Sequence, residues 1–215
     1  MNIPKFTIYG ERCSGTNYLE RIIRFNFDIK ITWEYGWKHF FGFNDLTNSD
    51  DTLFICIVRN PVDWLNSLYR ETHQIALHLR NSVDDFLNKE FYSFNDAGSG
   101  NPDGSEIMHD RNIYNGERYK NIFEMRHTKI KFCLEDMPNA VKNYIFVRYE
   151  DLINDFENTL YSIKRKGLKV KNKELFPRPI SSYKKKANEI PEDIIFNNPN
   201  FNKLYEEQLN YLNET

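Results

Sequence analysis

Three short segments of the chain are apolar at nearly every position and have the length of a β-strand. They are Lys5–Tyr9 (KFTIY), Leu53–Val58 (LFICIV) and Tyr144–Val147 (YIFV). Continuous apolar runs, unlike alternating ones, are typical of strands that helices cover on both faces. The pattern therefore predicts a buried parallel sheet.

Apolar positions at helical spacing follow each predicted strand. Helices are expected over Thr16–Phe25 and Val62–Leu79, and a third after Val147. The apolar stripes of the second and third helices are Trp64, Leu68, Ile75 and Leu79, and Leu152, Ile153, Phe156, Leu160 and Ile163. A terminal amphipathic helix is expected from Phe201, Leu204, Tyr205, Leu209 and Leu212. Strands that alternate with helices predict an α/β fold with a mostly parallel central sheet flanked by helices.

The length of 215 residues suits one domain of ordinary size, and we expect a single domain over residues 1–215. Within it, Ser93–Ser105 is rich in Gly, Asn, Asp and Ser and predicts a long surface loop. A lid over a site and a plain insertion are both consistent with such a loop.

The charge balance excludes one broad class of function. The chain has 29 Lys and Arg against 31 Asp and Glu, a net charge of −2, which excludes a bulk polycation acting on nucleic acid or anionic lipid. No apolar run is long enough to span a bilayer and the first residues lack a signal-peptide pattern, so we expect a cytoplasmic protein without a membrane span. The three cysteines, Cys13, Cys56 and Cys133, are expected to be free thiols.

The first predicted strand leads into a glycine loop, Gly10-Glu-Arg-Cys-Ser-Gly15-Thr-Asn17, that opens a helix. Backbone N–H groups at such a strand-to-helix turn can cradle phosphate. The glycines have Walker A spacing, but Thr16 and Asn17 stand where the phosphate-binding Lys and the Mg²⁺-binding hydroxyl would be. The loop predicts a phosphate cradle without the metal machinery, and the alternative is an ordinary turn capped by Ser14 or Thr16.

A second candidate anion site follows the second strand. Arg59 lies at the carboxyl end of a central strand, where open α/β sheets bind ligands. Helix-start preferences explain Asn60, Pro61 and Asp63, but they explain neither Arg59 nor Ser67, nearly two turns into the helix. An arginine fork and a hydroxyl in these positions could hold a phosphate together.

These motifs together resemble a known family. GERCSGTNYL and VRNPVDWLNS are similar to the nucleotide-binding motifs of the sulfotransferases that use 3′-phosphoadenosine 5′-phosphosulfate (PAPS), and Phe146–Leu152 (FVRYEDL) is similar to their R-Y-E-D-L element. The resemblance spans about Phe6 to Leu152. It implies a three-layer P-loop NTPase-like core and transfer of a sulfuryl group from PAPS to a hydroxyl or amine, a glycan included, with 3′,5′-ADP as product and no metal.

The resemblance also assigns residues. It implies that the loop around Arg12 and Cys13 contacts the 5′-phosphosulfate through Ser14, Gly15, Thr16 and Asn17, that Tyr18 packs on the adenine, and that Arg59 and Ser67 hold the 3′-phosphate. A late basic segment often closes over that phosphate in the family, which makes Lys184 in Tyr183–Lys186 a further candidate. Residues 160–186 hold ten Lys and Arg against one acid. One departure is Cys13, which stands where the family has a cation; Arg12 or Lys38 would have to replace it.

The base for the reaction is expected near Lys38. The segment Trp37–Phe41 (WKHFF) resembles the second-strand segment that supplies a base beside a Lys in some branches of the family, which makes His39 the candidate base. Adjacent residues of a strand point to opposite sides, so only one of Lys38 and His39 would face the site. Glu34 is a rival base, and a surface or core histidine is the structural alternative for His39.

Aromatic residues crowd this segment: Trp33, Tyr35, Trp37, Phe40, Phe41 and Phe43. They suit an acceptor pocket that stacks on sugar or aromatic rings, or a strand that packs in the core. The partners expected are thus a nucleotide donor and a small-molecule or glycan acceptor. The alternatives are a P-loop kinase-like nucleotide phosphotransferase, and a non-catalytic nucleotide-binding protein on the same scaffold.

Overall fold

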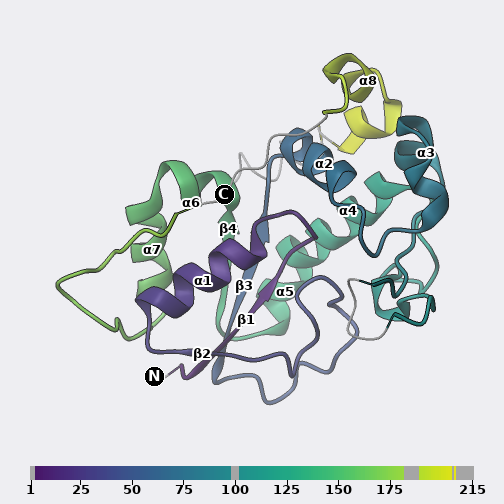
Figure 1. Ribbon diagram of the computed structural model, residues 1–215. Helices are drawn as coiled ribbons and strands as arrows, with labels where there is room; N and C mark the ends of the chain where they lie inside the picture. Colours follow the sequence, from purple (N-terminus) through teal and green to yellow (C-terminus); the bar gives the residue numbers. More distant parts are fainter. Residues whose placement is uncertain (1–2, 98–101, 182–188, 205, 207–215) are drawn as a thin grey trace. The chain divides into compact units, whose positions relative to one another are not determined.

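The computed structural model describes residues 3–97, 102–181, 189–204 and 206 (Figure 1). The chain divides into two compact units, each drawn from two stretches of sequence. The first unit comprises Met1–Asn60 and Lys129–Lys185, and the second Pro61–Thr128 and Lys186–Thr215. A single domain over residues 1–215 remains a prediction.

The first unit contains a parallel sheet with the strand order β2-β1-β3-β4. Its strands are β1 (Lys5–Tyr9), β2 (Lys30–Ile31), β3 (Thr52–Val58) and β4 (Tyr144–Arg148). All seven residues of the central strand β3 are buried, because β1 and β4 pair with its two edges and helices cover its faces. The predicted parallel sheet is confirmed, with β3 and β4 each one residue longer than expected.

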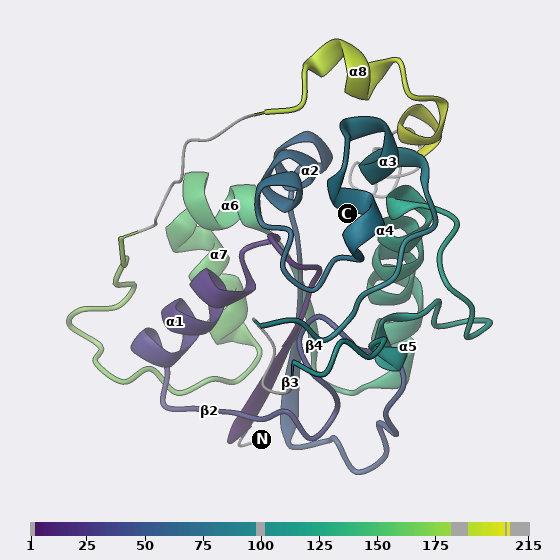
Figure 2. The same ribbon diagram turned by 45° about the vertical axis from the view of Figure 1, so that its right-hand side comes forward.

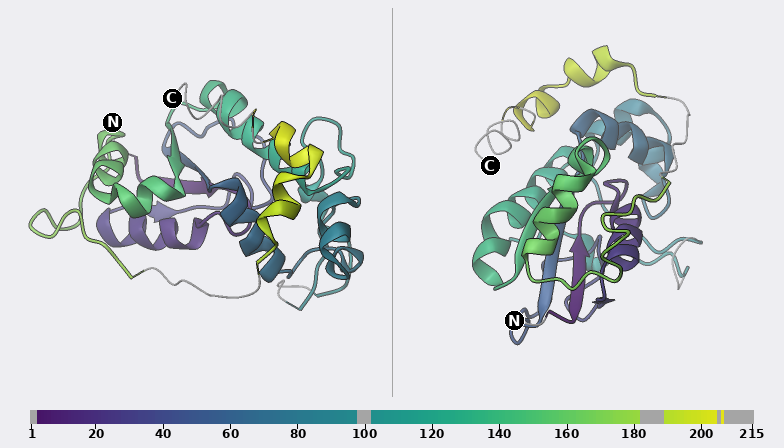
Figure 3. Two further views of the ribbon diagram at one scale, coloured as in Figure 1. Left: turned by 90° about the horizontal axis from the view of Figure 1, so that it is seen from above. Right: turned by 90° about the vertical axis from the view of Figure 1, so that its left-hand side faces the viewer.

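Helices cover both faces of this sheet. The helices on one face are α1 (Thr16–Asn26), α6 (Tyr149–Asn154) and α7 (Phe156–Arg165). They bury Leu19, Leu152 and Leu160 against the strands, and the right-hand view of Figure 3 looks onto this face. On the other face, a π-helical turn (Phe132–Asp136) leads into α5 (Met137–Ala140) (Figure 2). This confirms the predicted α/β core of three layers.

The helix predicted after the third strand is interrupted. It is divided into α6 and α7 at Asp155, whose backbone angles of φ −133° and ψ 49° lie outside the helical region. The apolar stripe nevertheless faces inward, with Leu152, Leu160 and Ile163 fully buried. The residues at the predicted helical spacing are therefore buried, although the backbone does not form one continuous helix.

The second unit is helical in its regular elements. These are α2 (Pro61–Arg70), α3 (Val83–Asn88), α4 (Ile122–Lys131, which ends in the first unit), α8 (Glu192–Phe196), and 3₁₀ turns at Leu77–Arg80 and Met108–Asp110. The predicted helix Val62–Leu79 was wrong in length. It ends at Arg70 because tertiary bonds hold the following segment: Gln74 has a φ of 61° and donates its N–H to Asp96, and the Arg80 guanidinium binds the Ile75 carbonyl.

The end of the chain is described only in part. Residues 199–204 are helical, and Phe201 and Leu204 are buried within the second unit, where the Phe201 ring packs against Phe123. The rest of the predicted terminal stripe, Tyr205, Leu209 and Leu212, lies outside the described residues. Within the described ranges, no helix has both the length and the apolar character needed to cross a bilayer.

Candidate functional site

The loop between β1 and α1 is shaped by two glycines. A Cβ on Gly10 would lie 2.7 Å from the Ile57 carbonyl oxygen, so the close approach of the loop to β3 requires glycine. Gly15 has a φ of +93°, and a Cβ there would lie 2.3 Å from the Tyr149 ring. Cys13, with a φ of 65°, is also left-handed. The loop thus folds back over the carboxyl end of β1 and delivers the chain into α1.

The N-terminus of α1 has no side-chain cap. Gly15 is the N-cap residue, and the first backbone bond runs from the Leu19 N–H to the Gly15 carbonyl at 3.0 Å. The N–H groups of the first turn of such a helix have no partner within the helix. Ser14 is fully buried, and its hydroxyl oxygen has no hydrogen-bond partner among the described residues. Ser14 therefore does not cap the helix, which removes one alternative for this loop.

A tight turn brings Lys38 and His39 to this loop. Residues 37–40 form the turn, with the Phe40 N–H bonded to the Trp37 carbonyl at 2.9 Å. The Gly10 N–H donates to the Lys38 carbonyl at 3.0 Å, and the Gly10 carbonyl lies 2.8 Å from His39 Nδ1. The expectation that Lys38 and His39 belong to a strand was wrong. These residues lie in a turn, and the turn is held to the loop by hydrogen bonds to both the N–H and the carbonyl of Gly10.

Lys38 lies over the first turn of α1. Its ammonium group donates to Asn17 Oδ1 at 2.5 Å and lies 3.8 Å from Glu20 Oε2. The neighbouring rings of Trp33 and Trp37 lie close to it, with their centroids at 5.7 and 5.0 Å from Nζ. Burial lowers the pKa of Lys38, and the Glu20 carboxylate opposes that shift. A cation from elsewhere in the chain thus stands beside the uncapped helix N-terminus.

The imidazole of His39 is held by its backbone partner. Because a carbonyl oxygen can only accept, Nδ1 carries the proton in the bond to Gly10, and Nε2 has the lone pair. Burial lowers the pKa of His39 to about 3, and the charges of Arg12, Lys38 and Lys129 contribute to the shift. The ring is therefore neutral near pH 7.

Arg12 lies on the same side of the loop as this ring. Its side chain is 5% exposed and its guanidinium lies 6.0 Å from the Phe40 ring centroid. Lys38 and Arg12 are the two candidates for the cation that Cys13 cannot supply, and they differ in position. Lys38 bonds to the first turn of α1, whereas Arg12 lies against the turn that carries His39.

Arg59 and Tyr149 close the other side of the loop. Arg59 donates through Nη1 to the Cys13 carbonyl at 3.2 Å, and its guanidinium lies 5.0 Å from the Tyr149 ring centroid. The Tyr149 ring also lies against Gly15, in the space that a Cβ there would occupy. The neighbouring Glu150 accepts a bond from the Asn60 N–H at 2.8 Å. The segment after β4 and the segment after β3 are thus joined around the loop.

The remaining predicted residues are Glu34, Tyr18, Ser67 and Lys184. Glu34 pairs with Lys5 at 3.1 Å, at the amino end of β1, whereas the loop follows its carboxyl end, so the structure does not bring this rival base to the loop. The Tyr18 hydroxyl donates to the Ile180 carbonyl at 3.4 Å. Ser67 lies on α2 in the second unit, and its pairing with Arg59 stays a prediction. Lys184 lies outside the described residues.

The aromatic residues between Trp33 and Phe43 were expected either to line an acceptor pocket or to pack in the core, and the structure shows some of them buried and others exposed. Tyr35 and Phe41 are buried, and Phe41 stacks on Tyr9 with 4.8 Å between centroids. Trp37 and Phe43 are 44% and 37% exposed. Part of the segment therefore packs in the core, and part faces solvent, with the Trp37 ring 5.0 Å from the Lys38 ammonium group.

Sequence reasoning missed three residues of this site. Tyr149 lies within Phe146–Leu152 (FVRYEDL), and this motif is the signal in the sequence that points to it. Glu20 follows Thr16 by one helical turn, and such spacing predicts a shared face. Lys129 donates to the His39 carbonyl at 2.8 Å and is 3% exposed, but it lies 90 residues away in a helix without a motif, so no local pattern pointed to it.

Comparison with known proteins adds one finding. No family model matches the chain, and no curated protein matches it. Among solved structures, the chain is similar to mouse sulfotransferase SULT7A1 complexed with PAP, with a TM-score of 0.40 and 15% identity. The match covers 81% of this chain and 63% of that one, so this chain spans less than two thirds of the mouse protein. What this chain does is therefore inferred from its own residues.

Proposed function

We propose that the protein is a sulfotransferase that moves a sulfuryl group from PAPS to a hydroxyl or amine acceptor. The observation that carries the proposal is the uncapped N-terminus of α1 with the buried Ser14 hydroxyl and the Lys38 ammonium beside it. Backbone N–H groups, a hydroxyl and a cation are the donors that a terminal phosphosulfate needs. They support donor binding by Ser14, Gly15, Thr16 and Asn17.

Lys38 is proposed to supply the cation that the loop lacks at Cys13. Bond cleavage leaves negative charge on the departing phosphate, and a fixed cation next to that oxygen stabilises the transition state. The contact of Lys38 with Asn17 supports this role for Lys38 over Arg12. Arg59, next to the loop at Cys13, is proposed to bind the 3′-phosphate together with Ser67.

His39 is proposed as the base. Nε2 would take the proton from the acceptor O–H or N–H as the acceptor oxygen or nitrogen attacks sulfur, and the Gly10 carbonyl holds the ring in the required tautomer. The pKa of about 3 belongs to the protein without a donor. Burial, the largest cause of the shift, would remain, but a donor with several negative charges would offset the charges of Arg12 and Lys38 and so raise the pKa of His39.

The exposed Trp37 ring next to Lys38 suits an acceptor with a ring, a sugar among them. A kinase-like phosphotransferase is disfavoured because Thr16 and Asn17 replace the residues that bind terminal phosphates and Mg²⁺. A non-catalytic nucleotide-binding protein would share the donor site and lack turnover. A cytoplasmic location belongs to the same proposal.

Thermal unfolding with nucleotides tests the proposal. We expect millimolar 3′,5′-ADP to raise the melting temperature without Mg²⁺, because a ligand that binds the folded state stabilises it, and ATP with Mg²⁺ to do little. Arg59→Ala should abolish the shift, whereas Arg21→Ala, an exposed arginine on α1, should leave it unchanged. Stabilisation by Mg-ATP alone would contradict the sulfotransferase proposal, and an intact shift in Arg59→Ala would contradict the role of Arg59.

A further inference from the structure

A groove runs beside the edge strand β4 and uses none of the residues proposed to bind the donor. β4 is last in the strand order, so within the described residues one of its edges has no neighbouring strand. The Phe54 N–H donates to the Asn143 carbonyl at 2.9 Å, and the backbone groups of successive strand residues point alternately to the two sides. The N–H and C=O of Phe146 therefore point away from β3, and no described residue pairs with them.

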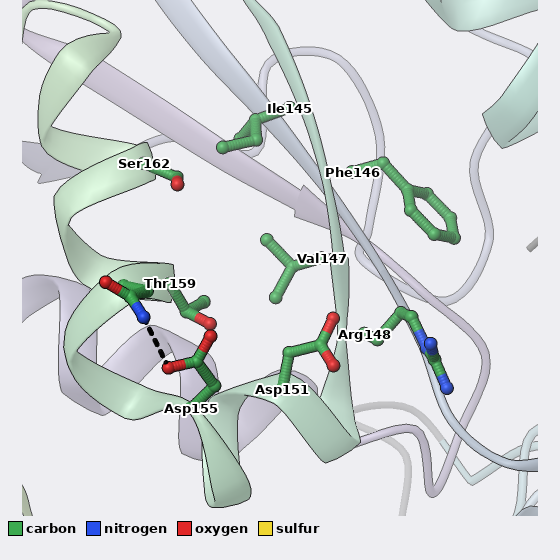
Figure 4. Close-up of a pocket in the computed structure, with 9 residues that line it drawn as sticks. Ile145, Phe146, Val147, Arg148, Asp151, Asp155, Thr159 and Ser162 are labelled. Carbon is green, nitrogen blue, oxygen red and sulfur yellow. Dashed lines mark hydrogen bonds between the residues drawn. The ribbon is translucent and has the colours of Figure 1, made fainter. Parts of the chain in front are cut away.

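Side chains from β4, α6 and α7 enclose the groove, which has a volume of about 220 Å³. Ile145 and Val147 point from β4 towards α7, whereas Phe146 and Arg148 point to the other side of the strand (Figure 4). The facing wall is polar and consists of Asp151, Asp155, Asn158, Thr159 and Ser162. The groove is thus apolar on the strand side and acidic on the helix side.

The polar wall follows from the sequence of α7. Thr159 and Ser162 are three residues apart and share one stripe of the helix, next to the apolar stripe that faces the core, and Asp155 is the N-cap residue that precedes this helix. Asp155 accepts a bond from Asn158 at 2.8 Å, which satisfies part of the capacity of its carboxylate. Across the described part of the chain, neither Asp151 nor Asp155 forms an ion pair.

We propose that this groove binds an extended, basic peptide segment of a partner protein. The segment pairs its backbone with the N–H and C=O of Phe146 and so extends the sheet by one strand, as exposed edge strands readily allow. A Lys or Arg side chain of the segment lies between Asp151 and Asp155. The unpaired edge of β4 favours a peptide with an extended backbone, and the two carboxylates favour a peptide with a cationic side chain.

A fluorescein-labelled seven-residue peptide of alternating Thr and Lys tests the proposal against the full chain by fluorescence anisotropy. We expect saturable binding, and none when Glu replaces Lys. N-methylation of one alternate set of backbone nitrogens should abolish binding because it removes the N–H groups that pair with β4, whereas methylation of the other set should be tolerated. No binding at millimolar peptide, equal binding of the Glu peptide, or binding of both methylated peptides would overturn the proposal.

Variants locate the site. Asp151→Asn and Asp155→Asn should each weaken binding about two- to fivefold, the effect of losing one partly exposed ion pair. Glu157→Gln removes an exposed acid from the same helix outside the groove and is expected to bind as the unchanged protein does. Equal weakening in all three variants would show a general charge effect and would contradict a site at Asp151 and Asp155.

Discussion

The environment of His39 determines its charge more than its residue type does. An imidazole in water titrates near pH 6.5, but burial and three nearby cations lower the pKa of this one to about 3. The hydrogen bond to Gly10 opposes the shift without reversing it. The side chain is therefore a neutral group that the fold holds against the glycine loop.

This shift predicts how stability depends on pH. Between about pH 6.5 and pH 3 the unfolded chain binds a proton at His39 and the folded chain does not, so the free energy of unfolding falls as the pH is lowered through that range. The contribution between pH 7 and pH 5 is about 1 to 2 kcal/mol. In His39→Asn this part of the loss should disappear, as urea unfolding at the two pH values would measure.

The unchanged protein, unfolded at the same two pH values, provides the reference for that measurement. An unaltered difference in His39→Asn would mean that His39 is solvated and titrates as in the unfolded chain.

At the scale of an element, the turn from β1 into α1 depends on glycine for two separate reasons. Gly15 adopts a positive φ, and the Tyr149 ring fills the space where its side chain would be. Gly116 has a φ of +74° and no atom within 4 Å of a Cβ position. The two glycines therefore separate the effect of backbone angle from that of packing.

We expect Gly116→Ala to lower the free energy of unfolding by about 1 kcal/mol, since a left-handed alanine costs about that much. Gly15→Ala should lower it by about 2 to 4 kcal/mol, because the overlap with Tyr149 adds to the backbone strain. Chemical unfolding of both variants measures the difference. Equal losses would show that the Tyr149 ring moves aside without resistance.

At the scale of the whole molecule, the single-domain prediction concerns whether the two units unfold together. The chain has three tryptophans, of which Trp33 and Trp37 belong to the first unit and Trp64 to the second. In a variant with Trp33→Phe and Trp37→Phe, fluorescence reports Trp64 alone, and amide exchange in β3 reports the first unit. One domain requires both probes to give the same urea midpoint; separate midpoints would indicate two domains.

The sequence by itself determined strands β1, β3 and β4, the strand-to-helix loop and the inward faces of the helices that follow these strands, because these depend on local periodicity and on glycine at fixed spacing. It did not predict β2, whose two residues are too few to show a pattern. It also placed Ser14, Gly15 and Arg59 at strand ends, which a parallel sheet gathers at one edge. The tertiary structure decided where the chain departs from its local pattern. Examples are the end of α2 at Arg70 and the turn at Lys38 and His39. It alone brought Lys38 to Asn17, Tyr149 to Gly15 and Lys129 to His39, because contacts between residues 21 to 134 positions apart depend on how the chain closes on itself and not on any spacing along it.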